Sequence, residues 1–126
     1  MSGCDVCIGG DIGDMIQDYD LSEKIAEVVL ACYECRGPIG IGEEYELCTG
    51  EFYDEEINYA TCLLCAEIAE VFSCGKGRTH GDLWERMQDH AFDDLTTATE
   101  CFRELSAAAK QAVLDRWNKW KFGKAS

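Results

Sequence analysis

Three cysteine pairs with the spacing Cys-x2-Cys limit what this chain can fold into more than any other feature. They read CDVC, CYEC and CLLC, and their members are Cys4 and Cys7, Cys32 and Cys35, and Cys62 and Cys65. Two-residue spacing lets one backbone turn point two thiolates at the same ion, and a tetrahedral zinc ion takes four such ligands. We therefore expect the chain to fold around at least one zinc ion.

The cysteine content favours metal binding over disulfide bonds in a reducing compartment. Nine cysteines occur in 126 residues, and the opening MSGCDVCIGGDIGD has neither the basic start nor the apolar stretch of a secretory signal. No apolar run approaches the roughly 20 residues that cross a bilayer. We expect a soluble, cytoplasmic protein whose thiols are free to bind metal.

The segment after the CYEC pair predicts a treble-clef-like zinc finger. Gly37 and Pro38 close a tight turn, or knuckle, and strand-like runs at 44–48 and 52–59 flank a turn at 49–50. The stretch CLLCAEIAEVF then repeats apolar residues at mostly helical spacing. Knuckle, β-hairpin and helix follow one another in the order of a treble clef.

The first predicted site joins the two ends of this hairpin through four thiolates, those of Cys32, Cys35, Cys62 and Cys65. One zinc ion would hold together an element that is too short to be stable by burial alone. The amino end of the following helix lowers thiol pKa values and favours the metal-bound thiolate. The alternative is a redox-active dithiol, but such a motif follows the first strand of a βαβ unit, a pattern that this sequence lacks. A closed four-sulfur site has no position for water, which predicts a structural role.

A second zinc ion is the further expectation for the CDVC pair. Its ligands would be Cys4, Cys7 and Cys74, with His80 or Cys48 as the fourth. Alternatively, the pair belongs to a mobile amino-terminal tail, and Cys48 and Cys101 are small buried hydrophobic residues.

The remaining pattern predicts an α+β fold in a single domain, residues 1–126. Its zinc-binding part covers 4–81, where an acidic polar stretch leads into a short strand at 28–31. Its helical part covers 82–126, with helices at 82–92 and 95–105 and a last helix after the amino-cap residue Ser106.

Aromatic and basic residues alternate near the end of the last helix, namely Trp117, Lys119, Trp120 and Lys121. One interpretation is a basic aromatic contact surface for a partner. The other is that the aromatic rings return to the core, while the bases offset the helix dipole and face the acidic body.

Charge divides the chain into an acidic body and a basic tail. The net charge is −14, and residues 1–109 hold 24 acids and 6 bases, whereas residues 110–126 hold one acid and 5 bases. An acidic body repels phosphate and attracts basic protein surfaces, so direct nucleic-acid binding by the body is not expected. Plain solubility is the alternative explanation of the acidic residues.

Two metal-dependent enzyme classes require residues that this sequence does not have. An HNH-type nuclease needs histidines on the hairpin and helix, and residues 36–61 contain none. A zinc deaminase needs a His-x-Glu ahead of Pro-Cys-x2-Cys, and TCLLC is preceded by neither that motif nor a proline. The protein is therefore expected not to be an enzyme.

Four stretches, CDVCIGG, CYECRGPIGIGEEYELCTGEFYD, TCLLCAEI and FSCGKGRTHGDLWERM, together resemble a family of small cysteine-rich proteins of temperate bacteriophages and prophages. The resemblance covers residues 4 to about 90, and most members have no assigned function. It implies that the three cysteine pairs and Cys74 belong to metal sites, and that the protein acts in the cytoplasm of a bacterial host.

Two functions follow as hypotheses. In the first, the chain is a non-enzymatic zinc-binding protein that docks on a host protein, such as a nuclease or defence complex, by imitating nucleic-acid charge. In the second, it is a nucleic-acid-binding or HNH-like treble clef that uses the basic tail. No membrane partner is expected, and the sequence leaves the oligomeric state open.

Overall fold

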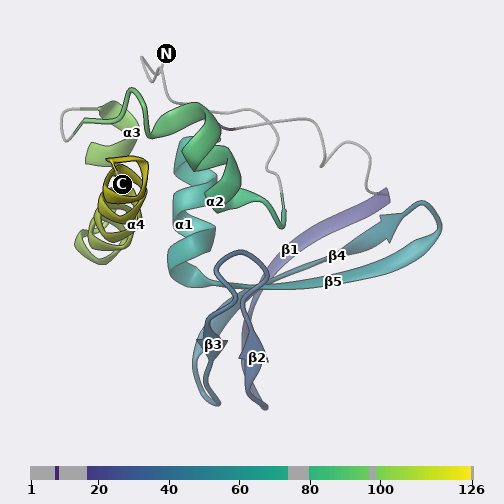
Figure 1. Cartoon of the computed structure of the whole chain (residues 1–126). Helices are drawn as coiled ribbons and strands as arrows, with labels where there is room; N and C mark the ends of the chain where they lie inside the picture. Colours follow the sequence, from purple (N-terminus) through teal and green to yellow (C-terminus); the bar gives the residue numbers. More distant parts are fainter. Residues whose placement is uncertain (1–7, 9–16, 74–79, 97–98, 126) are drawn as a thin grey trace.

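The computed structural model describes residues 8, 17–73, 80–96 and 99–125, with side chains up to residue 122. Its elements are β1 (Gln17–Ile25), β2 (Leu30–Ala31), β3 (Pro38–Ile39), β4 (Glu44–Phe52), β5 (Glu55–Cys62), α1 (Leu63–Phe72), α2 (Leu83–Arg86), the π-helical turn η2 (Met87–Ala91), α3 (Glu100–Arg103) and α4 (Ala107–Ala125). This order confirms the predicted α+β fold, in which a knuckle, a hairpin and a helix precede a helical region (Figure 1).

The main sheet has three antiparallel strands in the order β1-β4-β5. Strands β4 and β5 form the predicted hairpin, but the predicted turn at 49–50 is wrong. The chain turns at Tyr53 and Asp54, whose φ angles are 52° and 65°. Positive φ at both central residues suits the right-handed twist of a two-residue hairpin turn. Gly50 instead lies inside β4, opposite Ile57 of β5.

Strand β1 was not predicted, since its residues were assigned to an acidic loop. It pairs with β4, with Leu21 opposite Cys48 and Ile25 opposite Glu44. None of its residues is fully buried, so the alternation of apolar and polar residues that marks a half-buried strand is weak. Pairing with β4, which the sequence of β1 does not reveal, produces the strand.

Strands β2 and β3 form a small separate ladder, in which Leu30 pairs with Ile39. The strand predicted at 28–31 is therefore shorter than expected, and its partner is β3. We call residues 25–31 and 38–43 the β2–β3 lobe. Its two loops are joined because Ala26 N–H donates to the Glu43 carbonyl at 2.9 Å and Gly42 N–H donates to the Ala26 carbonyl at 2.8 Å. The lobe projects from the sheet in Figure 1.

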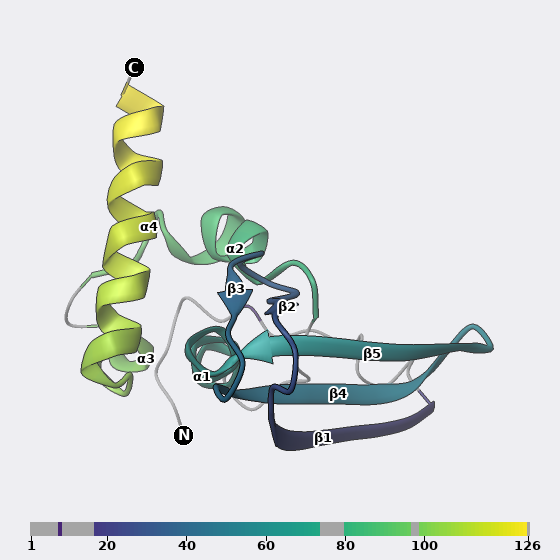
Figure 2. The same ribbon diagram turned by 90° about the horizontal axis from the view of Figure 1, so that it is seen from below.

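The helices pack around one apolar core. Helix α1 lies between the sheet and α4, and α4 stands at the end of the molecule away from the β4–β5 turn (Figure 2). The largest fully buried core side chains of the helices and the turn after η2 are Ile68, Phe72, Leu83, Met87, Phe92 and Val113. The helix predicted at 82–92 is present, whereas α3 covers only part of the predicted 95–105.

Helix α4 begins as the sequence predicts. The hydroxyl of Ser106 accepts the N–H of Ala109 at 3.3 Å, as an amino-cap residue does. The carboxylate of Glu67 in α1 accepts both the N–H and the hydroxyl of Ser106, at 2.6 and 2.8 Å. Glu67 thereby ties the start of α4 to α1. Across the described part of the chain, no helix combines the length and the apolar character that a membrane crossing requires.

Candidate metal centre

Four cysteines from three places in the fold meet at the base of the sheet. Cys32 and Cys35 lie in the knuckle between β2 and β3, Cys62 ends β5, and Cys65 lies in the first turn of α1. Their sulfur atoms all lie within 4.8 Å of one another. Four sulfurs bound tetrahedrally at about 2.3 Å from zinc are about 3.8 Å apart. The sulfur positions and the soft donor set therefore both fit a zinc ion.

The knuckle holds its two cysteines by backbone hydrogen bonds. Cys32 N–H donates to the Gly37 carbonyl at 2.8 Å, and Arg36 N–H donates to the Cys32 carbonyl at 2.9 Å. Arg36 adopts a φ of 64°, a left-handed conformation that reverses the chain. Gly37 N–H then approaches the Cys35 sulfur at 3.4 Å. The turn thus brings both thiols to the same side.

The Cys32 sulfur lies in a group of backbone donors. The N–H groups of Glu34, Cys35 and Cys62 point to it at 3.4, 3.5 and 3.3 Å. Such donors stabilise the charged thiolate, which is the form that binds a metal. They are the kind of supporting contact that orients ligands in metal sites.

The four sulfurs also interact with one another. Hydrogen bonds from the Cys62 and Cys65 thiols hold the pKa of Cys32 well below its ordinary value. The hydrogen bond between the Cys62 thiol and Cys32 raises the pKa of Cys62 to about 11. The hydrogen bond between the Cys65 thiol and Cys32 raises the pKa of Cys65 far above its ordinary value. A divalent cation binds thiolates, so metal binding at this centre would release the thiol protons.

Burial supports a closed site. Cys32 and Cys65 are buried, and Cys35 and Cys62 are half-buried. Four protein sulfurs complete a tetrahedral zinc site and leave no position for water or substrate. The arrangement can fix the knuckle, the end of β5 and the start of α1 in one geometry, which is structural work.

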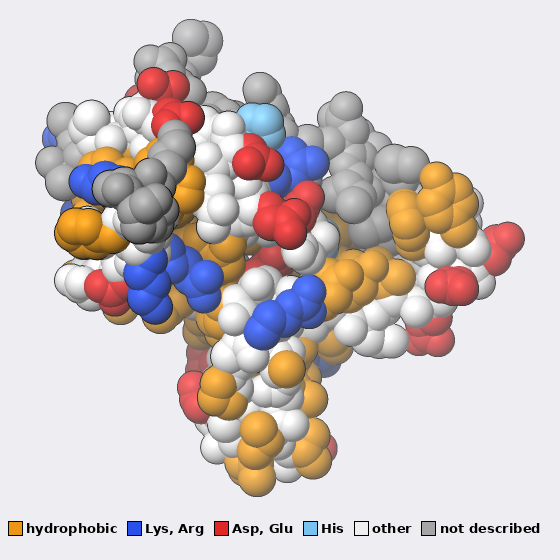
Figure 3. Space-filling model, in the orientation of Figure 1, with side chains coloured by type: hydrophobic (Ala, Val, Ile, Leu, Met, Phe, Trp, Pro, Cys, Tyr) orange, Lys and Arg blue, Asp and Glu red, His pale blue; other side chains and the backbone are white. Residues whose placement is uncertain are grey.

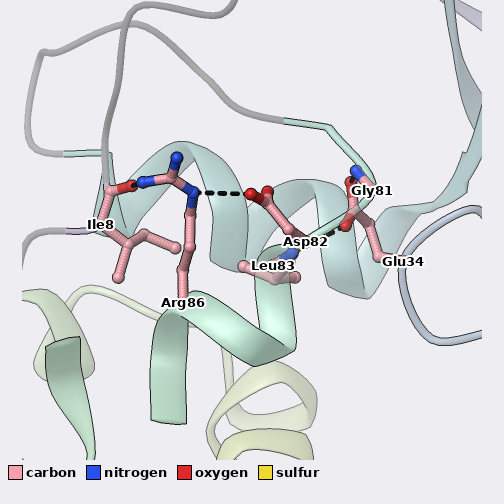
Figure 4. A network of polar contacts seen from close by, with 6 residues as sticks. All are labelled: Ile8, Glu34, Gly81, Asp82, Leu83 and Arg86. Carbon is pink, nitrogen blue, oxygen red and sulfur yellow. Dashed lines mark hydrogen bonds and ion pairs between the residues drawn. The ribbon is translucent and has the colours of Figure 1, made fainter. Parts of the chain in front are cut away.

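Glu34, inside the CYEC pair, connects the centre to helix α2. It is only 7% exposed, and its carboxylate accepts Gly81 N–H at 2.8 Å and Leu83 N–H at 2.9 Å (Figure 4). Burial raises the pKa of Glu34, and the two N–H donors oppose that rise. Sequence reasoning missed this residue, because its partners lie far along the chain.

Arg86 extends the same network. Its Nε donates to Asp82 Oδ2 at 2.8 Å, and its Nη1 donates to the Ile8 carbonyl at 3.4 Å. Ile8 N–H in turn donates to the Phe72 carbonyl at 2.9 Å. Figure 4 shows the contacts around Arg86 beside those of Glu34. The knuckle, the start of α2 and the end of α1 are linked by polar contacts.

Aromatic rings pack beside this network, next to Glu34 and Gly81. Tyr33 and Tyr59 stack with ring centroids 4.2 Å apart, and the Arg36 guanidinium lies 5.2 Å from the Tyr33 ring. His80 is buried, and its Nε2 lies 2.7 Å from the Tyr19 hydroxyl. The His80 ring also lies 5.8 Å from that of Tyr59.

The second predicted zinc site falls largely outside the described residues, because Cys4, Cys7 and Cys74 are not among them. Of its alternative fourth ligands, His80 contacts Tyr19, and Cys48 is buried within the sheet beside Ile57. Within the described ranges, the four-cysteine group is the one place where three or more metal-binding side chains bring their ligand atoms together.

Cys101 is buried in the main core, as its amphipathic surroundings predicted. It is disulfide-bonded, whereas no disulfide involves Cys32, Cys35, Cys48, Cys62 or Cys65. The expectation that the thiols stay reduced therefore does not hold at this position.

Two aromatic residues of α4, Trp117 and Trp120, pack against the core, while Lys119 and Lys121 remain outside. Trp117 Nε1 donates to the Phe92 carbonyl at 3.1 Å, and the Trp120 ring lies 5.6 Å from that of Phe92. Lys119 and Lys121 are exposed. The four residues singled out from the sequence thus divide into two that pack on the core and two that contact solvent.

Comparison with protein-family models, curated proteins and solved structures finds no match to this chain. These comparisons identify no family and no phage origin. The zinc-binding arrangement therefore rests on the geometry of the four cysteines.

Proposed function

We propose that this protein is a non-enzymatic binding protein, stabilised by zinc, that docks through its acidic sheet on a basic surface of another protein. The observation that carries the proposal is a closed four-sulfur centre at the base of a strongly acidic sheet. Residues 17–62, which form the sheet, the knuckle and the β2–β3 lobe, hold twelve acids and two bases. The metal supplies rigidity, and the surface charge supplies the means of binding.

The acidic residues of this segment are placed to act on a partner. Apart from Glu34, which is buried, and Glu46, which is half-buried, they are exposed. A cluster of exposed like charges attracts basic surfaces over a distance of about 10 Å at 0.1 M salt, and this attraction weakens as salt rises. Binding is therefore expected to be fast and sensitive to ionic strength.

The resemblance to phage proteins suggests the class of partner. A host nuclease or defence complex that binds nucleic acid has a basic groove, and an acidic sheet would compete with the nucleic acid for it. On this proposal the protein acts in the cytoplasm of a bacterial cell and inhibits its target by occupying that groove.

The metal part of the proposal is tested by elemental analysis of the purified protein. Wild type should contain at least one zinc ion per chain, and Cys35→Ser should lose the ion held by the four-cysteine centre. The double variant Cys4→Ser with Cys7→Ser tests the second predicted site separately. Wild type that contains no zinc after expression in zinc-supplemented medium would contradict the proposal.

The docking part is tested by retaining partners from a bacterial lysate on tagged protein and counting them by mass spectrometry at low and high salt. Glu23→Lys with Glu44→Lys reverses two exposed charges on the sheet. Glu85→Lys with Glu104→Lys makes the same change of charge on exposed residues of the helical region. Only the sheet variant should lose its partners. Partners that are retained equally at low and high salt, or an equal loss of partners in both variants, would refute docking through the sheet.

A nucleic-acid-binding function is the second candidate, favoured by the basic end of α4. Lys119 and Lys121 are exposed there, and Phe122 beside them is 75% exposed. This function predicts that the intact protein binds duplex DNA or RNA at low salt, and that Lys119→Glu with Lys121→Glu abolishes the binding. Fluorescence anisotropy with labelled oligonucleotides measures both. An HNH-like nuclease remains the weaker form, since residues 36–61 of the hairpin region contain no histidine.

A further inference from the structure

The β2–β3 lobe exposes four branched aliphatic side chains, which is unusual for a small soluble domain. Ile25, Val28, Val29 and Ile41 are 62%, 60%, 64% and 69% exposed. In Figure 3, hydrophobic side chains gather over the lobe that projects at the bottom of the view. An apolar cluster of this kind on a folded surface marks a contact site for another molecule.

Backbone hydrogen bonds fix the part of the lobe that carries these exposed side chains. The two loops of the lobe are joined by the hydrogen bonds between Ala26 and Glu43 and between Gly42 and Ala26. Ile39 of β3, in contrast, is buried in the main core. The lobe is thus anchored through its inner residues and presents the four aliphatic side chains outward.

A groove lies beside these side chains. It has a volume of about 670 Å³, and its walls are apolar side chains together with the charged residues Glu23, Lys24 and Glu27. A volume of this size accepts a few side chains of a peptide segment. The lobe therefore offers both an apolar surface and a recess beside it.

Acidic residues surround the apolar cluster. Glu23, Glu27, Glu43 and Glu44 are exposed on the same strands and loops, and Lys24 is the one base within residues 17–31 and 38–47. Two copies that met lobe to lobe would bring two acidic rims together, and an anionic membrane would be repelled. The charge pattern selects a partner that is apolar at its centre and basic around it.

We infer that the β2–β3 lobe is the centre of the docking surface, and that its ligand is an apolar protein segment flanked by lysine or arginine. This inference rests on the proposed docking function and names the contact that would provide most of its affinity. A few buried aliphatic or aromatic anchors dominate binding energy, and charged rims add specificity and association rate.

The test uses Val28→Ser with Ile41→Ser, two changes at exposed positions that leave the core intact. Phe122→Ser is the control, because it removes an apolar side chain of α4 that is at least as exposed as Val28 and Ile41. The probe is a fluorescent peptide with an aliphatic centre and lysines at both ends. One comparison peptide replaces the lysines with glutamates, and another replaces the aliphatic centre with serine and glycine. Zinc content confirms that every variant keeps the metal centre.

Wild type and Phe122→Ser should bind the basic aliphatic peptide alike, and the lobe variant should bind at least about tenfold more weakly. The two comparison peptides should bind poorly. Equal binding of either comparison peptide, no binding of the basic aliphatic peptide to wild type, or unchanged binding by the lobe variant would overturn the inference. Dimerisation of wild type that the lobe variant loses, measured by sedimentation, would overturn it in favour of a second copy.

The lysate experiment separates this inference from the proposed function. If wild type retains partners in a salt-dependent way and the lobe variant retains them equally, docking stands and the lobe assignment fails. If wild type retains none at any salt concentration, the docking function itself fails.

Discussion

Glu34 should stabilise the fold by joining the metal centre to helix α2, and its replacement measures that connection. Glu34→Ala removes the acceptor for two backbone donors, Gly81 N–H at 2.8 Å and Leu83 N–H at 2.9 Å. Leu83 is fully buried, so that its N–H would be left without a partner, which costs about 1–3 kcal/mol. Gly81 is half-buried, and water can replace part of its bond.

Part of this loss is recovered, because the buried carboxylate itself carries a desolvation cost that Ala removes. The net expectation is that Glu34→Ala lowers the free energy of unfolding by about 2 kcal/mol. Glu34→Gln keeps an oxygen for one donor and should lose less. Urea titration followed by tryptophan fluorescence, with zinc in fixed excess, measures the difference between these variants.

Glu43→Ala is the control for this prediction. Glu43 Oε1 also accepts a backbone N–H, that of Gly40 at 2.7 Å, but this bond is exposed to solvent. Its loss should cost less than about 0.5 kcal/mol. If Glu34→Ala is no less stable than Glu43→Ala, burial of the carboxylate does not determine the strength of the connection and the reasoning is wrong.

Three further predictions use the same unfolding assay. Gly81→Ala should lower the free energy of unfolding by about 1 kcal/mol or more beyond the loss caused by Gly42→Ala. Both glycines have positive φ, but a Cβ at Gly81 would lie 2.7 Å from Tyr33, whereas nothing lies within 4 Å of a Cβ at Gly42. Equal losses would contradict this prediction. Phe92→Ala should cost about 3–5 kcal/mol, because Phe92 is buried, while the exposed Phe122→Ala should change stability by less than about 0.5 kcal/mol; similar values for both would refute the assigned core. The part of the stability that depends on zinc should be present at neutral pH and lost as the pH falls, because protons compete with zinc for the thiolates. Zinc release, measured with a coloured chelator, should coincide with unfolding. Zinc release without any loss of structure would show that the metal does not stabilise the fold.

The sequence predicted the four-cysteine cluster and the order of elements because the relevant information is local. Two-residue cysteine spacing and the helical repeat after Cys62 are visible in short windows. The hairpin turn was misplaced because Gly50 resembles a turn residue, whereas the chain reverses at Tyr53 and Asp54. A glycine allows a turn without requiring one.

Features that depend on distant partners were not predictable in this way. Strand β1 exists because β4 pairs with it, and its own side chains carry little alternation. Glu34 gained its role only when the fold brought Gly81 and Leu83 to it. The two tryptophans of α4 fit either a surface or a core from the sequence alone, and their contacts with Phe92 depend on how α4 packs.

The distance between the metal centre and the β4–β5 turn allows the length of the hairpin to vary without disturbing the centre. The four sulfurs fasten the hairpin at its base, and Tyr53 and Asp54 lie at the other end of the two strands. Residues added in equal numbers to both strands near that tip, two at a time, would preserve which side chains face each side of the sheet. The β4–β5 hairpin can therefore be lengthened, shortened or extended by a grafted loop while the four cysteines at its base keep their positions. Selection or a protein engineer can adjust its length independently of the core.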